Sequence, residues 1–353
     1  MTERAAALIE KLASAHSLTL EEYRELIEAQ SPETARALAA RAVEVRKSVY
    51  GTAVYVRGLI EISNICKNDC LYCGIRRGNA RCERYRLSPE EILRCGEMGY
   101  HMGFRTFVLQ GGEDPFFTDQ VLCGLVEAMK QAHPDCAVTL SMGERSRESY
   151  QKLREAGADR YLLRHETANR AHYEKLHPAE MSFENRMRCL RGLKELGYQV
   201  GCGFMVGSPG QTSETLAEDL KFIEDFKPDM CGVGPFVPHK DTPFRDHPAG
   251  TLEQTCYLLS IIRLIHPPVL LPATTALGTI HPEGRELGIL AGANVVMPNL
   301  SPENVRGKYE LYNNKLNTGA EAAQGLAALK ERMGRIGYQV ATDRGDVKRE
   351  GTM

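Results

Sequence analysis

The sequence lacks the long apolar runs that mark membrane-spanning or exported proteins. No stretch of its 353 residues approaches eighteen consecutive apolar residues, and residues 1–30 are charged and helical in pattern, without an uninterrupted apolar segment. A membrane-spanning helix needs about twenty mainly apolar residues, and a secretion signal needs a shorter apolar core. We therefore expect a cytoplasmic protein that has no membrane partner.

An excess of charge of either sign is also absent. The chain has 44 Lys and Arg against 46 Asp and Glu, which gives a net charge of −2. A chain balanced in this way has no field that would hold a nucleic acid or an anionic membrane surface. We therefore expect no nucleic-acid partner, which leaves small molecules and proteins.

Paired cysteine motifs are scarce, although the chain has eleven cysteines. Without a secretion signal, such cysteine usage argues against a disulfide framework and for reduced thiols together with a metal site. Eight cysteines stand singly, and we interpret them as small buried hydrophobic residues. They are Cys82, Cys95, Cys123, Cys136, Cys189, Cys202, Cys231 and Cys256.

Short β-rich runs alternate with amphipathic helical segments along most of the chain. Such alternation is typical of a parallel sheet covered by helices. Hydrophobic residues at 42% and charged residues at 25% allow a large core. We predict eight strands, at residues 54–63, 106–111, 137–142, 160–166, 200–206, 230–237, 270–276 and 295–298.

Eight βα units predict an α/β fold, a (βα)8 TIM-type barrel with an N-terminal helical cap. A doubly wound open sheet would fit the periodicity almost as well, because periodicity does not reveal which strands are neighbours. We expect residues 1–50 to form the helical cap and residues 51–317 the barrel. We expect residues 318–353 to form a helix followed by a charged tail.

Helix boundary signals support this division. Thr19 with Glu22 has the spacing of a capping box, and Ser88-Pro89-Glu90-Glu91 is expected to start a helix. Gly157 and Gly197 stand where two helices are expected to end. We therefore predict helices that begin and end at these residues.

Three cysteines, Cys66, Cys70 and Cys73, follow the first predicted strand at C-x3-C-x2-C spacing. Three thiolates can hold three irons of a 4Fe-4S cluster and leave the fourth iron open. A zinc site would need a fourth ligand, and Cys82 is the only further cysteine nearby. A ferredoxin-like carrier would also need a fourth cysteine. The spacing, with Tyr72 before the last cysteine, resembles the signature of the radical S-adenosylmethionine (SAM) superfamily.

Polar residues gather at the ends of the later strands, where a barrel places its chemistry. Alternation puts Thr139 and Ser141 on one face and Arg164 and Glu166 on another, whereas His165 has the opposite parity and is interpreted as structural. Further candidates follow the second, seventh and eighth strands or lie early in a helix: Gln110, Gly111, Gly112, Glu113, Arg186, Thr274, Thr275, Met297, Tyr309 and Tyr312.

Taken together, these strings resemble the HydE-type FeFe-hydrogenase maturases over nearly the full length. The resemblance is carried by residues 66–73, 163–169, 206–212, 234–239 and 272–276. It implies a complete barrel and one 4Fe-4S cluster held by the three cysteines. It implies SAM contacts from Tyr72, Gly112, Glu113, Ser141, Glu166 and Arg186. It also implies a substrate pocket formed by Gln110, Thr139, Arg164, Thr274, Thr275, Met297, Tyr309 and Tyr312.

The chain departs from its relatives at particular positions. Some family members bind a second cluster through cysteines near the C-terminus, but no cysteine follows Cys256 here, so we predict a single cluster. Gly111 stands where a serine can occur. Biotin synthase has cluster-binding cysteines on inward strand positions, where this chain has Thr139 and a displaced Cys202. 3-Methylornithine synthase is a further alternative within the superfamily.

The resemblance implies that a reduced cluster cleaves SAM to a 5′-deoxyadenosyl radical. This radical would act on a small iron species with cysteine, carbon monoxide and cyanide ligands during assembly of the hydrogenase diiron site. The expected partners are this small-molecule substrate, a reductase, ferredoxin or flavodoxin as electron donor, and other hydrogenase maturation proteins. An alternative of another class is an iron–sulfur or zinc scaffold without radical chemistry, which would need a fourth protein ligand.

Overall fold

A computed structural model of the chain describes residues 1–317 and 323–348. Its helices are α1 (Glu3–Ala15), α2 (Leu20–Glu28), α3 (Pro32–Tyr50), α4 (Pro89–His101), α5 (Asp119–Ala132), α6 (Arg147–Glu155), α7 (Arg170–Leu176), α8 (Phe183–Glu195), α9 (Ser213–Phe226), α10 (Leu252–Ile265), α11 (Thr275–Ile280), α12 (Gly284–Leu290), α13 (Glu303–Arg306) and α14 (Leu326–Arg335). Its strands are β1 (Ala53–Val56), β2 (Gly58–Ser63), β3 (Thr106–Gly111), β4 (Ala137–Ser141), β5 (Arg160–Leu162), β6 (Gln199–Cys202), β7 (Met205–Val206), β8 (Met230–Cys231), β9 (Gly234–Pro235), β10 (Val295–Val296) and β11 (Gln339–Ala341).

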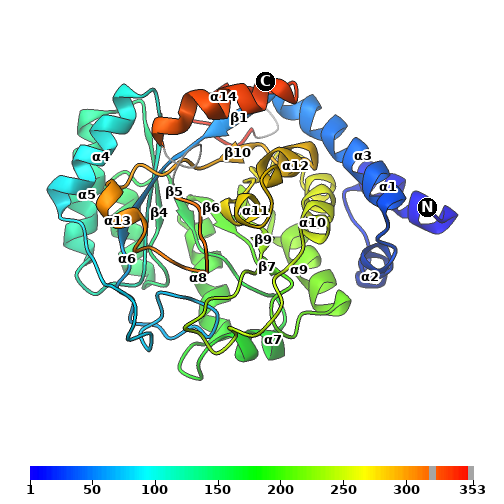
Figure 1. Cartoon of the computed structure of the whole chain (residues 1–353), viewed down its shortest axis with the longest axis horizontal. Coiled ribbons are helices and arrows are strands. Elements are labelled where there is room, and N and C mark those ends of the chain that lie inside the picture. The colour runs from blue at the N-terminus through cyan, green and yellow to red at the C-terminus, as the bar shows by residue number, and fades with distance from the viewer. Residues whose placement is uncertain (318–322, 349–353) are drawn as a thin grey trace.

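The parallel strands close into a barrel surrounded by helices (Figure 1). Six strands pair in the order β2-β3-β4-β5-β6-β8, and β1 pairs with β10. Single bridges complete the ring, from Met230 to Leu270, from Pro272 to Val295 and from Leu59 to Asn299. The ring passes through all eight predicted strand positions. The (βα)8 fold is therefore confirmed, and the open-sheet alternative is wrong.

Helices α1–α3 lie along one side of the barrel (Figure 1). Tyr23 on α2 donates a hydrogen bond to Glu224 on α9 at 2.6 Å, and Tyr257 on α10 donates to the Leu26 carbonyl at 2.6 Å. The predicted capping box of Thr19 is present, and the helix predicted to start at Ser88 also begins with a capping box. Within the described residues, none of the helices combines the length and apolar character that a membrane span requires.

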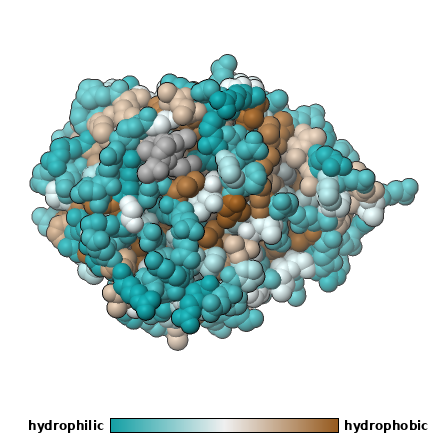
Figure 2. Space-filling view, viewed as in Figure 1, coloured by the Kyte–Doolittle hydropathy of each residue, from teal (hydrophilic) through white to brown (hydrophobic). Residues whose placement is uncertain are grey.

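Hydrophilic side chains cover most of the outer surface in the view of Figure 2, and the hydrophobic ones that show lie mainly toward its centre.

The predicted helix ends are confirmed, because Gly157 and Gly197 follow α6 and α8 with φ of 110° and 79°. Only glycine adopts such φ values without strain. The local signals in the sequence thus position the helices well.

Three predicted strands are each divided in the structure, at Arg57, Gly203 and Gly232. Gly203 has a φ of 145°, and a Cβ on it would lie 2.0 Å from the Gly232 carbonyl oxygen. The two backbones therefore approach at paired glycines, and β7 and β9 form a separate pair beyond them. The prediction of continuous strands at 200–206 and 230–237 was wrong because glycine here marks a close backbone contact. The predicted strand at 54–63 is instead divided at Arg57, where the pairing changes from β10 and β11 to β3.

The predicted strand at 270–276 is also wrong over its second half. Only Leu270 and Pro272 make bridges, and Thr274 is the N-cap of α11, which begins at Thr275. The predicted strand at 160–166 likewise ends at Leu162. The first segment leaves the barrel wall because Thr274 begins the turn into α11. In the second segment, Glu166 has a φ of 67° and makes only a single bridge, to Phe204.

The C-terminal part is more structured than the predicted charged tail. Strand β11 pairs in parallel with β1, and the chain then crosses the base of the barrel. There the Arg344 carbonyl accepts hydrogen bonds from Thr106 and Arg160, and Arg160 contacts Asp346 at 2.7 Å. Arg160 is fully buried. The polar residues 343–347 therefore cover the amino ends of the barrel strands.

Replacing Asp346 with Asn tests this closure. Burial alone would raise the pKa of Asp346, but the hydrogen bond from Arg344 and the charge of Arg160 outweigh burial and hold the pKa well below its ordinary value. Such a carboxylate stabilises the fold above the unfolded pKa of about 3.9 and loses this effect as the pH falls toward the folded pKa.

We expect Asp346→Asn to lower the free energy of unfolding at pH 7 by about 1–2 kcal/mol, at the lower end for charged hydrogen bonds because the side chain is 38% exposed. Urea unfolding of the metal-free protein at pH 7 and pH 3.5 measures the difference, which should narrow in acid. The control is Asp343→Asn. Asp343 lies in the same segment, but its carboxylate accepts a hydrogen bond from a backbone amide, that of Gly345. A loss that does not depend on pH would contradict the ion-pair explanation.

Candidate active site

A cavity of about 360 Å³ opens at the carboxyl ends of the barrel strands. Its wall contains every residue for which the sequence predicted a role in the site. These residues are Cys66, Cys70, Tyr72, Cys73, Gln110, Gly112, Glu113, Thr139, Ser141, Arg164, Glu166, Arg186, Thr274, Thr275, Met297, Tyr309 and Tyr312. Their individual roles remain predictions.

The three cysteines lie on the long loop between β2 and α4, whose backbone is held by polar side chains of the same loop. Arg84 donates to the carbonyl oxygens of Asn64, Ile75, Arg76 and Asn79 at 2.6–3.2 Å. The Asp69 carboxylate accepts two hydrogen bonds from Arg76. These contacts join only groups of the protein, so the loop supports its own backbone around the three cysteines.

Burial makes the three thiols weakly acidic. It raises the pKa of Cys66, raises the pKa of Cys73 to about 12 and raises that of Cys70 well above its ordinary value. The Glu113 amide donates to Cys66 Sγ at 3.3 Å, which stabilises the thiolate of this cysteine. The metal-free thiols are thus protonated at neutral pH, and a soft metal displaces the protons as it binds.

The donor set fits a 4Fe-4S cluster better than a single metal ion. Across residues 1–317 and 323–348, no group of three or more His, Cys, Asp or Glu side chains lies close enough to hold one ion. A cubane cluster instead takes each thiolate at a separate iron, so its ligands stand further apart. Cys82 lies in the wall of a different pocket. Only Cys66, Cys70 and Cys73 line the cavity itself, which leaves a fourth iron without a cysteine ligand.

Gly112 and Glu113 pack directly against the cysteine loop. A Cβ on Gly112 would lie 2.3 Å from the Ile65 carbonyl oxygen, so this position admits only glycine. Glu113 accepts a hydrogen bond from the Glu144 amide at 3.0 Å and contacts Lys67 at 3.1 Å. The predicted SAM-binding motif therefore contacts the cysteine loop on one side and the segment after β4 on the other.

Arg164 and Glu166 face the cavity together, as their parity predicts, and contact each other at 2.9 Å. The second carboxylate oxygen of Glu166 is buried and has no hydrogen-bond partner. His165 points away from the cavity, and its Nε2 lies 3.4 Å from the carboxylate of the buried Asp219. His165 therefore supports the strand end from behind, in agreement with its predicted structural role.

Arg186 is buried, although a single arginine on a helix is usually exposed. It donates to Glu144 and to the Arg164 carbonyl at 2.5 and 2.6 Å. Tyr72 meets the ring of His177, and burial lowers the pKa of His177 to about 4, so this ring is neutral at pH 7. No signal in the sequence points to His177, because its position depends on the packing of α7.

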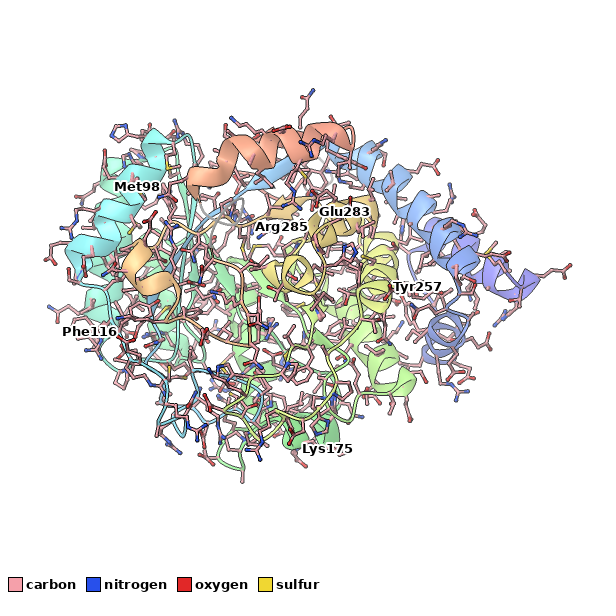
Figure 3. The ribbon with its side chains drawn as sticks, viewed as in Figure 1. Met98, Phe116, Lys175, Tyr257, Glu283 and Arg285 are labelled. Atoms are coloured by element: carbon pink, nitrogen blue, oxygen red, sulfur yellow. The ribbon has the colours of Figure 1, made fainter. Side chains whose placement is uncertain are left out.

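The hydroxyl groups of Thr139 and Thr274 are buried in the cavity region without a hydrogen-bond partner. Thr275 accepts a hydrogen bond from Arg285 at 3.1 Å. Arg285 is buried at the start of α12, close to α11 in Figure 3. Thr275 is thus oriented by a cation outside the cavity, whereas Thr139 and Thr274 remain available to a ligand.

Sequence reasoning missed several charged and thioether groups in the wall. Arg57, between β1 and β2, and Glu61 on β2 line the cavity together with Lys315, Met205 and Met230. Alternation along residues 57, 59 and 61 would have found the first two, because all three face inward. Lys315 lies in an irregular segment, where periodicity carries no signal.

Comparison with known proteins agrees with this geometry. A family model for the radical SAM superfamily matches residues 60–223. The FeFe-hydrogenase maturase subunit HydE of Thermotoga maritima is 48% identical, covering 77% of this chain and 78% of that protein. The 3-methylornithine synthase of Methanosarcina acetivorans is 31% identical, covering 81% of each. The crystal structure of methylornithine synthase (PylB) superposes with a TM-score of 0.80 at 27% identity, covering 95% of this chain and 97% of that one.

The family relationship also identifies the cofactors. Radical SAM enzymes use a 4Fe-4S cluster and SAM, and the three cysteines and the cavity beside them suit both groups. The chain therefore belongs to the radical SAM superfamily, in the family of the FeFe-hydrogenase maturase HydE, and is a radical SAM enzyme.

Proposed function

We propose that this enzyme acts in the maturation of FeFe-hydrogenase. Its substrate is a small, anionic iron complex with cysteine, carbon monoxide and cyanide ligands, on the route to the diiron site. The 48% identity to the Thermotoga maritima maturase subunit, over 77% of this chain, supports this function. The observation that carries it is a group of buried hydrogen-bond donors that have no protein partner.

These donors are two guanidinium nitrogens of Arg57 and the hydroxyl groups of Thr139 and Thr274. Arg57 is 4% exposed, and burial together with the nearby charge of Arg160 lowers its pKa well below the ordinary value. A buried donor without a partner is unfavourable, and a ligand rich in acceptor atoms would satisfy all three side chains at once. Carboxylate and cyanide groups are such acceptors.

Soft side chains complete the same pocket. Met205, Met230 and Met297 line the cavity, and Arg57 donates to the Met230 sulfur at 2.8 Å. Thioethers are polarizable and pack well against a metal complex. An amino-acid substrate without a metal, as in a methylornithine synthase, would make less use of three thioethers. This comparison favours the iron complex.

The protein's part in the reaction is to position the reactants and to exclude water. When bound, the reduced cluster supplies the electron that cleaves SAM to methionine and a 5′-deoxyadenosyl radical. The residues that would hold SAM are Tyr72, Gly112, Glu113, Ser141, Glu166 and Arg186. Arg57, Thr139 and Thr274 would orient the substrate. The enclosing barrel protects a reactive radical from side reactions.

The alternative functions fit the described residues less well. A biotin synthase-like reaction would need cysteines on the cavity wall for a second cluster, but Cys202 faces the outer core, with its sulfur 4.0 Å from that of Cys231. A zinc scaffold would need a fourth ligand close to the other three. The same proposal includes two kinds of protein partner in the cytoplasm. One is the electron donor, which is a reductase, ferredoxin or flavodoxin. The other is the set of other hydrogenase maturation proteins.

Replacing Cys70 with Ala tests the radical chemistry. We expect 5′-deoxyadenosine formation to fall at least a hundredfold, because the cluster loses one of its three thiolates. The measurement is product formation after anaerobic reconstitution with iron and sulfide, dithionite reduction and addition of SAM. Cys82→Ala is the matched control and should keep its activity. Retained cleavage in Cys70→Ala would refute the cluster assignment, and loss in Cys82→Ala would favour a four-ligand scaffold.

Replacing Thr274 with Val tests the substrate pocket. This change removes an unpaired hydroxyl at nearly constant volume, so SAM cleavage without substrate should stay unchanged. We expect the KM for a synthetic iron complex with cysteine, carbon monoxide and cyanide ligands to rise about tenfold, the effect of about 1.4 kcal/mol for one hydrogen bond to a charged ligand.

Infrared bands of the carbonyl and cyanide ligands follow consumption of the complex. Thr255→Val is the control, because that buried hydroxyl bonds the Thr251 carbonyl on α10, away from the cavity. An unchanged KM in Thr274→Val would argue against substrate contact at this residue.

A further inference from the structure

An irregular segment after α13, residues 308–315, crosses the mouth of the cavity. We call it the strap. In Figure 1 it is the orange chain that passes across the view of the strands. Its backbone joins two loops: the Lys308 carbonyl accepts from Asn64 at 2.7 Å, and the Asn313 amide donates to the Pro238 carbonyl at 3.1 Å. The strap carries Tyr309 and Tyr312 into the cavity wall.

The strap also contacts the cysteine loop directly. The Gly74 amide, next to Cys73, donates to the Leu311 carbonyl at 2.8 Å. A Cβ on Gly74 would lie 2.1 Å from the Glu310 carbonyl oxygen, so the two backbones touch. A shift of the strap would therefore move the backbone beside Cys73 as well as the wall of the substrate pocket.

A buried ion pair holds the far end of the strap to the barrel wall. The Lys315 ammonium lies 2.5 Å from Glu61 Oε1, and the two side chains are 8% and 0% exposed. Glu61 is itself fixed, because Asn299 donates to its other oxygen at 2.8 Å and Ser301 Oγ accepts from its amide at 2.8 Å. Lys315 thus binds to a rigid carboxylate.

Lys315 also touches the predicted substrate residues. Its ammonium lies 5.0 Å from the ring centroid of Tyr309, within the range of a cation–π contact. The Tyr309 hydroxyl lies 3.5 Å from Gln110 Nε2. A buried ion pair adds little net stability compared with apolar packing, but it selects one arrangement of the groups around it. Here that arrangement is the strap closed over the cavity.

We propose that Lys315 is a positioning residue, which holds Tyr309 and Tyr312 over the substrate and keeps the cavity closed during radical formation. The inference rests on the proposed function in one respect, namely that the cavity is the substrate site. Without the Lys315–Glu61 pair the strap opens, water enters, and radicals are lost before they reach the substrate. Lys315 acts through Tyr309 and the strap and does not touch the reacting atoms.

The test compares Lys315→Met, Lys315→Arg and Lys308→Met in the reconstituted enzyme with SAM bound. Lys308 is the matched control, since it lies on the same strap but pairs with the exposed Glu83. Hydrogen exchange of strap amides should be at least tenfold faster in Lys315→Met. It should be nearly unchanged in Lys315→Arg, which keeps the charge, and in Lys308→Met.

The second readout is the amount of 5′-deoxyadenosine formed per iron complex consumed. We expect this ratio to rise severalfold in Lys315→Met and to return toward the wild-type value in Lys315→Arg. Because the pair acts as a unit, Glu61→Gln combined with Lys315→Met should be no worse than Lys315→Met alone.

Each result decides a separate question. Unchanged exchange in Lys315→Met, or equal effects of Lys315→Met and Lys308→Met, would overturn the proposal. Faster exchange with an unchanged ratio would limit the pair to a structural role and would also overturn it. The hydrogen-exchange measurement needs no iron complex. If the wild-type enzyme does not consume the iron complex, the proposed function is refuted. The exchange data then still decide whether Lys315 closes the strap.

Discussion

The active site depends on the hydrogen bonds that side chains make to the backbone of the cysteine loop. This loop has no regular hydrogen-bond ladder, and each buried carbonyl left without a partner costs about 1–3 kcal/mol. One guanidinium, that of Arg84, provides donors for four of these carbonyls. Asn64 supplies the rest of the connection, because it binds the Glu83 and Lys308 carbonyls and the Tyr85 amide. The loop, the strap and the three thiols therefore share one polar support.

The sequence predicted those parts of the fold that depend on neighbours along the chain. Thr19 and Glu22 form their capping box because the partners are three residues apart, and β3 has the predicted bounds because its β-rich run is continuous and pairs on both sides. The division at Gly203 was not predictable, since it depends on a carbonyl of Gly232 in the next strand. Strand β11 was missed for a similar reason, because it has only three residues and forms through its contact with β1.

The same distinction applies to the site. Parallel strands bring their carboxyl ends together, so parity alone placed Thr139, Ser141, Arg164 and Glu166 on one cavity wall. Parity does not reveal which groups bind each other. The contact between Arg164 and Glu166, the support of Tyr72 by His177 and the burial of Lys315 against Glu61 depend on tertiary packing. The family resemblance supplied the residue set but not these partnerships.

The cover at the base of the barrel has a consequence for the order of events during synthesis. Residues 343–347 are translated after every barrel strand, and domains generally fold as units. Arg160 and Thr106 have no Arg344 carbonyl to bind until this segment is made. The barrel therefore reaches its complete set of buried contacts only late in synthesis, after its strands and its cysteine loop have all been translated.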